Sequence, residues 1–296
     1  MITPEEMVDR LNAIFGSHPG RRTLHAKGII CFGTFRPAPE AAKLTSAAHM
    51  GADEVPVLAR LSNGSGNPRH PDSAPDVRGL AVSFELPDGS RTDIVAQTAP
   101  RFPVRTPDDF IELVEAVQRS PRALYRLPIF LLRNPRAIPA LRVNLSALGT
   151  PDSYATPRFY AIHAFRWVDA DGGERWVRYT WIPRSGASSA AERSERGRDY
   201  LIDEVRGRLP DEPIRFDLEL QIADGGDDPH DPRSRWPDER RRVLAGTLEL
   251  TGVDDDVDSM IFDPMRLTDG IEPSEDPILH YRPGAYSVSY ERRTGG

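Results

Sequence analysis

GIICFGTF (residues 28–35) is the stretch that decides the fold class, and three runs of the same kind follow it. They are VPVLARLS (55–62), RGLAVSFEL (78–86) and RTDIVAQT (91–98). Short apolar runs that are separated by clusters of Pro, Gly and Asp are typical of β-strands. The pattern therefore predicts that this part of the chain is a β-meander.

The same pattern continues toward the C-terminus. HAFRWV (163–168) and RWVRYTWI (175–182) are joined by the turn sequence DADGG, which predicts a hairpin. IRFDLELQIA (214–223) and RRVLAGTLELTGV (241–253) add two more strands. About eight strands without βαβ alternation predict an α+β fold, an antiparallel β-barrel with helical insertions.

Helical patterns lie around and between these strands. Thr3 and Glu6 form a capping box for an N-terminal helix that ends near residue 16. Residues 107–148 are rich in Leu, Ala and Arg and are broken by prolines, which predicts two or three successive helices. Residues 188–209 predict another helix, with Leu201, Val205 and Leu209 on its inner face. Residues 223–242 carry turn residues and charges of both signs, so we expect a surface loop with little to bury.

Composition excludes several classes of protein. The 296 residues carry 38 Lys and Arg against 45 Asp and Glu, a net charge of −7, which argues against a nucleic-acid-binding protein and against general attraction to membranes. The lone Cys31 excludes an internal disulfide and a zinc or iron–sulfur site built on several thiolates. The N-terminus has neither a signal-peptide pattern nor an apolar span, so we expect a cytoplasmic protein.

Three stretches carry residues with chemical potential: RRTLHAKG (21–28), VLARLSNG (57–64) with DVRGLAVSF (76–84), and ILHYRPGAY (278–286). A lone histidine before a strand is more often a satisfied polar residue than a catalytic base, and an isolated R-x-x-x-Y is more often scaffold than a cofactor site. Each stretch by itself therefore favours a structural role over a catalytic or cofactor-binding role.

Taken together, these stretches resemble the haem catalases. HAKG (25–28), RLS (60–62), DVRGLA (76–81), PRFPVRTPDDF (100–110) and FDP with GIEPS (262–264 and 270–274) match blocks of that family in that family's order. The N-terminal arm, the wrapping connection and the C-terminal regions of full catalases are missing, so the chain is similar to the small catalase-related peroxidases. The resemblance implies one haem-binding domain over residues 1–296, with a helix (1–16) and a barrel core with its proximal helix (20–293).

On the distal side of the haem, the resemblance implies three catalytic residues. His25 matches the histidine that takes a proton from one peroxide oxygen and returns it to the other. Ser62 matches the residue that hydrogen-bonds this imidazole, and otherwise is a strand-end serine. Gln97 lies where catalases carry an asparagine, and its amide reaches one methylene further. If the alignment slips by one position, Gln97 is a polar residue at a strand end.

On the proximal side, the resemblance implies that Tyr286 is the axial ligand of the iron. Arg282 lies four residues earlier, which on a helix puts it on the same face, although Pro283 lies between them. His163 and Asp276 fall where catalases continue this network beyond the arginine. The competing interpretation of His163 is an ordinary alternating strand residue.

Further residues would hold the cofactor. Phe110 resembles the aromatic residue that stacks on the porphyrin, and Phe102 resembles one that lines the distal channel; as lone aromatics both would more often be core. Cys31 could also ligate haem, but it lies in an apolar strand without an activating neighbour and is interpreted as core. Three basic residues match those that bind the haem propionates: Arg22, Arg60 and Arg293.

The resemblance thus predicts a haem b peroxidase that reduces hydrogen peroxide or organic hydroperoxides with a small-molecule electron donor. We expect weak catalase activity at most, because of Gln97 and of a haem left accessible by the missing regions. The alternatives are a lipid hydroperoxide isomerase on the same barrel and a non-catalytic haem-binding protein. We expect no nucleic-acid or membrane partner, and a monomer or homodimer rather than a tetramer. The physiological reductant and the preferred peroxide stay open.

Overall fold

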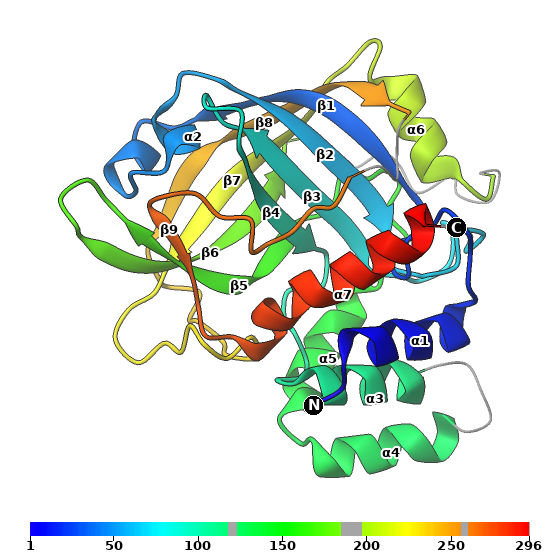
Figure 1. Cartoon of the computed structure of the whole chain (residues 1–296). Coiled ribbons are helices and arrows are strands. Elements are labelled where there is room, and N and C mark those ends of the chain that lie inside the picture. Colours follow the sequence, from blue (N-terminus) through cyan, green and yellow to red (C-terminus); the bar gives the residue numbers. More distant parts are fainter. Residues whose placement is uncertain (118–122, 185–196, 256–259, 296) are drawn as a thin grey trace.

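The computed structural model describes residues 1–117, 123–184, 197–255 and 260–295 (Figure 1). Its centre is a nine-stranded antiparallel sheet with the strand order β4-β3-β2-β1-β8-β7-β6-β5-β9. The strands are β1 (Gly28–Pro37), β2 (Val55–Asn63), β3 (Arg78–Glu85), β4 (Arg91–Gln97), β5 (Phe159–Val168), β6 (Glu174–Pro183), β7 (Ile214–Ile222), β8 (Arg242–Asp254) and β9 (Ile271–Pro273).

A pairing between β4 and β5 closes the first eight strands into a barrel, and the residues that meet there are Gln97 and Tyr160. The short strand β9 pairs with β5 outside this ring. The predicted antiparallel barrel with helices is confirmed. The pairing of β4 with β5 joins all eight strands into one ring.

The strands alternate between an inner and an outer face, as the period of a β-strand requires. On β7, Ile214, Phe216, Leu218 and Leu220 all point into the core and are fully buried, while the intervening residues are only partly buried. Large aromatic side chains, among them Trp181, fill the barrel together with these residues.

The helices are α1 (Pro4–Phe15), α2 (Ala48–Gly51), α3 (Pro107–Val117), α4 (Ala123–Arg133), α5 (Ala137–Ala147), α6 (Tyr200–Arg208) and α7 (Pro277–Thr294), with a 3-10 turn, η1 (Ala41–Lys43). The capping box of Thr3 and Glu6 is present at the start of α1. The three helices α3, α4 and α5 confirm the helical prediction for residues 107–148. No helix in the described part of the chain is long and apolar enough to cross a lipid bilayer.

Two sequence predictions need correction. Of the helix expected over 188–209, residues 188–196 lie outside the described part of the chain, residues 197–199 are not helical, and α6 begins at Tyr200. Its inner face is as expected, since Leu201, Val205 and Leu209 are buried. The loop before β8 does bury a large side chain, because Trp236 is 3% exposed and its ring packs under the Arg178 guanidinium at 4.3 Å.

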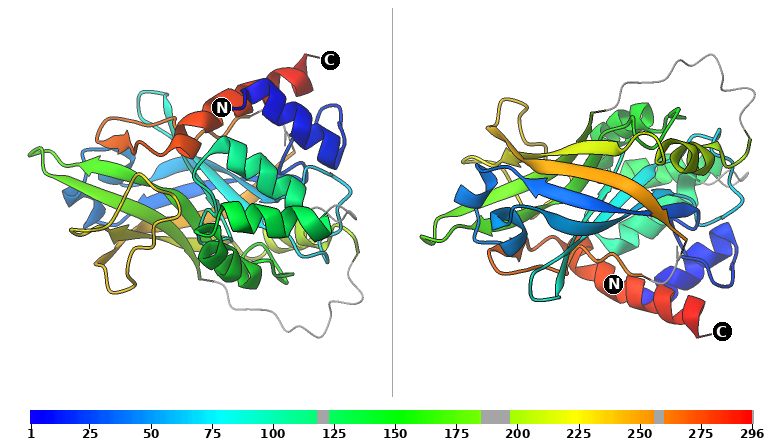
Figure 2. Two further views of the ribbon diagram at one scale, coloured as in Figure 1. Left: turned by 90° about the horizontal axis from the view of Figure 1, so that it is seen from below. Right: turned by 90° about the horizontal axis from the view of Figure 1, so that it is seen from above.

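Helices α1, α3 and α7 lie together outside the barrel (Figures 1 and 2). α1 and α7 approach closely where α7 has a glycine: a Cβ at Gly284 would lie 2.9 Å from Cγ of Pro4. α7 remains helical through Pro283. This group of helices covers one side of the barrel, and the space between helices and strands is the site described next.

Candidate active site

A cavity with about 1430 Å³ of empty space, part of it open to solvent, lies between the barrel and the helices α1, α3 and α7. On the barrel side, most lining residues follow the two-residue period of a strand and point outward from adjacent strands. They are Arg60 and Ser62, Gly79 and Ala81, Val95 and Gln97, and Tyr160 and Ile162. Leu80, Ala96 and His163 also line the cavity, outside this period. On the helix side, α1 contributes Met7, Val8 and Leu11, and α7 contributes Arg282, Ala285 and Tyr286.

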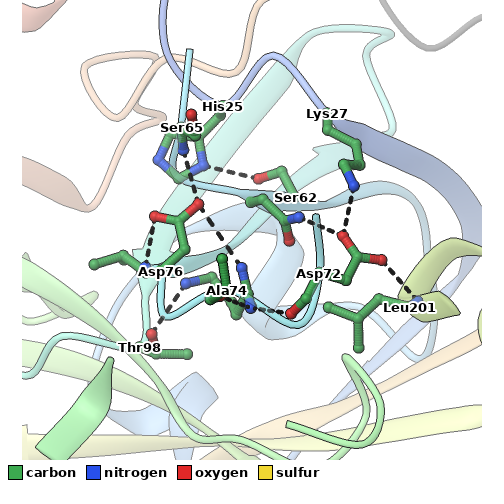
Figure 3. Close-up of polar contacts among 12 residues, drawn as sticks. His25, Lys27, Ser62, Ser65, Asp72, Ala74, Asp76, Thr98 and Leu201 are labelled. Carbon is green, nitrogen blue, oxygen red and sulfur yellow. Dashed lines mark hydrogen bonds and ion pairs between the residues drawn. The ribbon is translucent and has the colours of Figure 1, made fainter. Parts of the chain in front are cut away.

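His25 lines the cavity just before β1, and its backbone is tightly held. Its φ of 55° lies in the left-handed region, which non-glycine residues seldom adopt. The backbone N–H of His25 donates to the carbonyl of Gly64 at 3.1 Å, and the carbonyl of His25 accepts a hydrogen bond from Nη2 of Arg60 at 2.8 Å. Nδ1 of its ring lies 3.0 Å from Oγ of Ser62, and this contact is drawn in Figure 3. Strained backbone that is held by surrounding contacts is common at functional sites.

The surroundings of His25 keep its imidazole neutral. Burial lowers its pKa from 6.5 to about 3, and the nearby guanidinium groups of Arg60, Arg282 and Arg22 act in the same direction. At neutral pH the ring is therefore uncharged and can accept a proton.

Gly79 was missed by the sequence analysis as a residue of the site. A Cβ at this position would lie 2.7 Å from Oγ of Ser62 and 2.9 Å from Nδ1 and Cε1 of His25. Only glycine leaves room for the hydrogen-bonded pair, and the signal was present in the run DVRGLA, where a lone Gly interrupts a strand pattern.

A buried network of polar groups lies behind the His25–Ser62 pair (Figure 3). The carboxylate of Asp72, which is fully buried, accepts hydrogen bonds from Nζ of Lys27 at 2.7 Å, Nδ2 of Asn63 at 2.6 Å and the backbone N–H of Leu201 at 2.9 Å. Lys27 is two residues from His25, and Asn63 follows Ser62. The network therefore fixes the start of β1 to the end of β2 at the point where the pair forms.

Gln97 is the last residue of β4 and lies opposite Gly79 in the ladder. Its side chain faces the cavity and is partly exposed there. Gln97 thus shares the cavity with His25 and Ser62, as the resemblance implies.

On the opposite wall, four side chains make contact in series. Nε of Arg282 donates to the hydroxyl oxygen of Tyr286 at 2.8 Å, and Nη2 donates to the same oxygen. Nη1 of Arg282 donates to Nε2 of His163 at 2.9 Å, and Nδ1 of His163 lies 2.6 Å from Oδ2 of Asp276. Since an arginine only donates, Nε2 must accept, so the proton of the His163 ring is on Nδ1 and is donated to Asp276. Burial lowers the pKa of His163, against the opposing effect of Asp276, which agrees with this neutral form.

The remaining predicted residues also reach the cavity. Phe102 and Phe110 both line it and stack on each other, with centroids 5.5 Å apart and an interplanar angle of 22°. Arg22 and Arg293 line it from different segments, and both donate to the carbonyl of Met260. Arg60, from β2, lies beside His25. Of the twelve predicted residues, only Asp276 stands back from the cavity wall, behind His163.

The donor set fits a haem. The cavity is mostly apolar, it carries a phenol oxygen suited to negative charge because two guanidinium N–H groups donate to it, and it offers arginines for carboxylates. A neutral imidazole lines the same space. Fold and site together define a closed antiparallel barrel with a cavity, suited to a haem, between its outer face and a group of helices.

Comparison with known proteins identifies the family. The family model described as Catalase matches residues 18–296. A catalase-related peroxidase of Mycolicibacterium paratuberculosis is 44% identical, with 99% of this chain and 96% of that protein covered. A catalase-related peroxidase of Synechococcus elongatus is 30% identical, with 100% of this chain and 90% of that protein covered. A catalase of Listeria seeligeri is 28% identical over 93% of this chain and 61% of its own length. The chain belongs to the catalase family, whose members are generally haem-dependent.

Proposed function

We propose that the protein is a haem b peroxidase, which reduces hydrogen peroxide or organic hydroperoxides with electrons from a small-molecule donor. The observation that carries this proposal is the pairing of two polar sets across one apolar cavity. One set is the series Asp276, His163, Arg282 and Tyr286, and the other is the pair His25 and Ser62. The two most similar relatives named above are both catalase-related peroxidases.

Tyr286 would be the protein ligand of the iron, and the haem would supply redox chemistry that no side chain of this cavity provides. Arg282 orients the phenol oxygen by donating to it twice, and His163 with Asp276 holds the guanidinium in that position. Arg22, Arg60 and Arg293 would hold the propionates, and Phe110 would pack against the porphyrin.

His25 would move the proton that peroxide cleavage requires. With Nδ1 held by Ser62, the other ring nitrogen, Nε2, is the atom left to act in the cavity. We assign the ring proton to Nδ1, so that Nε2 takes the proton from one peroxide oxygen and delivers it to the oxygen that leaves. Over the whole reaction, two electrons from the external donor and two protons convert hydrogen peroxide to two molecules of water, or an organic hydroperoxide to an alcohol and one molecule of water.

Gln97 favours peroxidase over catalase turnover in this proposal. Oxidising a second peroxide requires that molecule to be oriented tightly in the cavity, and the longer glutamine amide holds it less well than an asparagine would. A donor that delivers single electrons to the cofactor edge needs no such orientation. The opening of the cavity to solvent gives it access.

Loading the purified protein with haem and recording its spectrum tests the proposal most directly. A high-spin ferric spectrum with a tyrosinate charge-transfer band is expected, together with peroxide-dependent oxidation of a donor dye. Product analysis with an organic hydroperoxide should show the corresponding alcohol in amounts that match the oxidised dye. Haem binding without peroxide consumption would indicate a carrier, and rearranged products without dye oxidation would indicate an isomerase.

A further inference from the structure

The segment of helices α4 and α5 concentrates positive charge. Between Glu115 and Asp152 the sequence has six arginines, no lysine and no acidic residue. The whole chain carries −7, so the residues outside this segment carry −13. The negative net charge argues against a membrane partner for the chain as a whole, but it conceals this local cluster of positive charge. Arg119 and Arg122 lie outside the described residues, and the other four are Arg126, Arg133, Arg136 and Arg142.

Helix α4 is apolar on two opposite faces. On its inner face Phe130, Leu127 and Leu131 pack against Leu113 and Ala116 of α3 in a second apolar cluster. A helix with this composition all round is normally buried on all sides.

The outer face of α4 is open. Its side chains, at positions i, i+4 and i+7 of one stripe, are 53% exposed at Tyr125, 46% at Ile129 and 84% at Leu132. Figure 1 shows α4 at the end of the molecule away from the barrel, with α3 between them. No other described part of the chain covers this stripe.

Exposed arginines continue from the end of the stripe. Arg133 follows Leu132, and Arg136 lies in the turn to α5; both are exposed, and no carboxylate of the described residues lies within salt-bridge distance of either. Arg142 on α5 is also exposed. Arg126 is the exception, since it faces Glu115 at 3.6 Å. We call Tyr125, Ile129, Leu132, Arg133 and Arg136 the α4 surface.

We propose that the α4 surface docks the protein on an anionic lipid bilayer. At the surface of such a bilayer, the apolar side chains can insert among the acyl chains. The arginines beside them can donate hydrogen bonds to the lipid phosphates. A twofold contact between two copies of this surface would bring like charges together, which disfavours the second copy as occupant. The charge of the surface therefore points to an anionic partner.

The position of this surface gives docking a functional consequence. Phe130 of α4 belongs to the same apolar cluster as Phe102 and Phe110, both of which line the cavity. The inner face of α4 and the apolar cluster that it shares with α3 thus lie between the docked face and the site. Docking would concentrate the enzyme where apolar hydroperoxides dissolve, but it does not depend on the proposed peroxidase activity.

Flotation of the haem-loaded full chain with lipid vesicles tests the proposal. We expect the protein to float with vesicles that contain phosphatidylglycerol and to stay behind with pure phosphatidylcholine. Raising the ionic strength to about 1 M, where the Debye length is about 3 Å, should release most of it. The assay uses neither peroxide nor donor, so its failure would leave the proposed peroxidase function untouched.

Matched variants locate the contact. Leu132→Glu, and separately the double change Arg133→Glu with Arg136→Glu, should each weaken vesicle binding about 10-fold or more. The controls are Leu244→Glu, an exposed leucine on the barrel, and Arg91→Glu with Arg241→Glu, which should bind like the wild type. Equal losses in variants and controls, or no binding to anionic vesicles, would overturn the proposal. So would a concentration-dependent dimer that Leu132→Glu dissociates without any vesicle binding.

Discussion

At the scale of single residues, the two walls of the cavity use hydrogen bonds to select one state of each reactive group. Ser62 holds Nδ1 of His25, and Arg282 donates twice to the Tyr286 oxygen. His163 accepts from Arg282 and donates to Asp276, so the direction of every hydrogen bond in that series is determined. Three substitutions probe Tyr286, His25 and the distal amide of Gln97 separately.

Tyr286→Phe should lose the tyrosinate charge-transfer band and most of the bound haem, because phenylalanine has no oxygen to ligate iron. Absorption spectra and haem content per chain measure this. Tyr290→Phe is the matched control, since Tyr290 lies on the same helix but does not line the cavity. Full haem content and an unchanged spectrum in Tyr286→Phe would refute the assignment of the ligand.

His25→Asn should slow the reaction of the ferric enzyme with peroxide by about 10²-fold or more while haem still binds. Asparagine tolerates the left-handed backbone at this position, so the substitution removes the base without removing the fold. Because the pKa of His25 is lowered to about 3, the wild-type rate should stay level as pH falls from 8 to about 5 and decline only below that. An acid limb with its midpoint near 6.5 would contradict this environment for His25.

Gln97→Asn should raise oxygen evolution from hydrogen peroxide relative to oxidation of a donor dye. The shorter amide is expected to orient a second peroxide better than glutamine does. The ratio of the two rates, measured on one preparation, removes differences in haem content. A lower ratio in the variant, or full catalase turnover in the wild type, would show that this amide does not decide between the two reactions.

At the scale of elements, strand and helix ends bring the reactive groups to the cavity. β1 begins beside His25, β2 ends at Asn63 directly after Ser62, and β3 begins at Arg78 directly before Gly79. The buried carboxylate of Asp72 links the first two of these ends. Asp276 has a second role as the N-cap of α7, where Oδ1 accepts from the N–H of Ile278 at 2.8 Å. One carboxylate thus starts the helix and supports its arginine.

Gly79→Ala tests how closely the strands must approach. The added methyl would meet Ser62 and His25 at less than 3.0 Å, so the pair must move apart. A displacement of about 1 Å should lower the rate of peroxide cleavage by about 10²-fold with haem retained. Gly207→Ala, in α6 with nothing within 4 Å of the new methyl, should keep the wild-type rate. Equal rates in both variants would show that the cavity wall yields to the extra methyl group.

At the scale of the whole molecule, the cavity lies between the barrel and the helices α1, α3 and α7, which short segments of chain connect to the barrel. The barrel supplies one wall, and α1 and α7, from opposite ends of the chain, supply another (Figure 2). Thr23, two residues before His25, donates through its N–H to Oγ of Ser289 on α7 at 3.2 Å. A ligand bound between the barrel and the helices stabilises both of them by mass action.

Removing haem should therefore loosen the helices more than the barrel. Hydrogen exchange of the apo and holo proteins should show the largest loss of protection in α1 and α7, and little change in β6 to β8, which do not line the cavity. Uniform loss across the barrel would mean that the cofactor is needed for the whole fold. Unchanged exchange in α7 would argue against haem binding at this site.

The barrel, the capping box of α1 and the three helices between residues 107 and 148 could be predicted from the sequence, because they depend on local periodicity and turn residues. Local patterns were wrong about residues 197–199, which precede α6, and about Trp236, which is buried. Which side chains a polar segment covers depends on tertiary packing, and local patterns do not report packing. The twelve candidate residues follow from the resemblance of ordered stretches of the sequence to the haem catalases. Tertiary structure alone decided that eleven of them line one cavity, because strands and helices far apart in sequence supply its walls. Tertiary structure also lowers the pKa of His25, brings Gly79 close to the His25–Ser62 pair and leaves the outer face of α4 exposed to solvent. Burial, close approach and exposure depend on neighbours that no local pattern specifies.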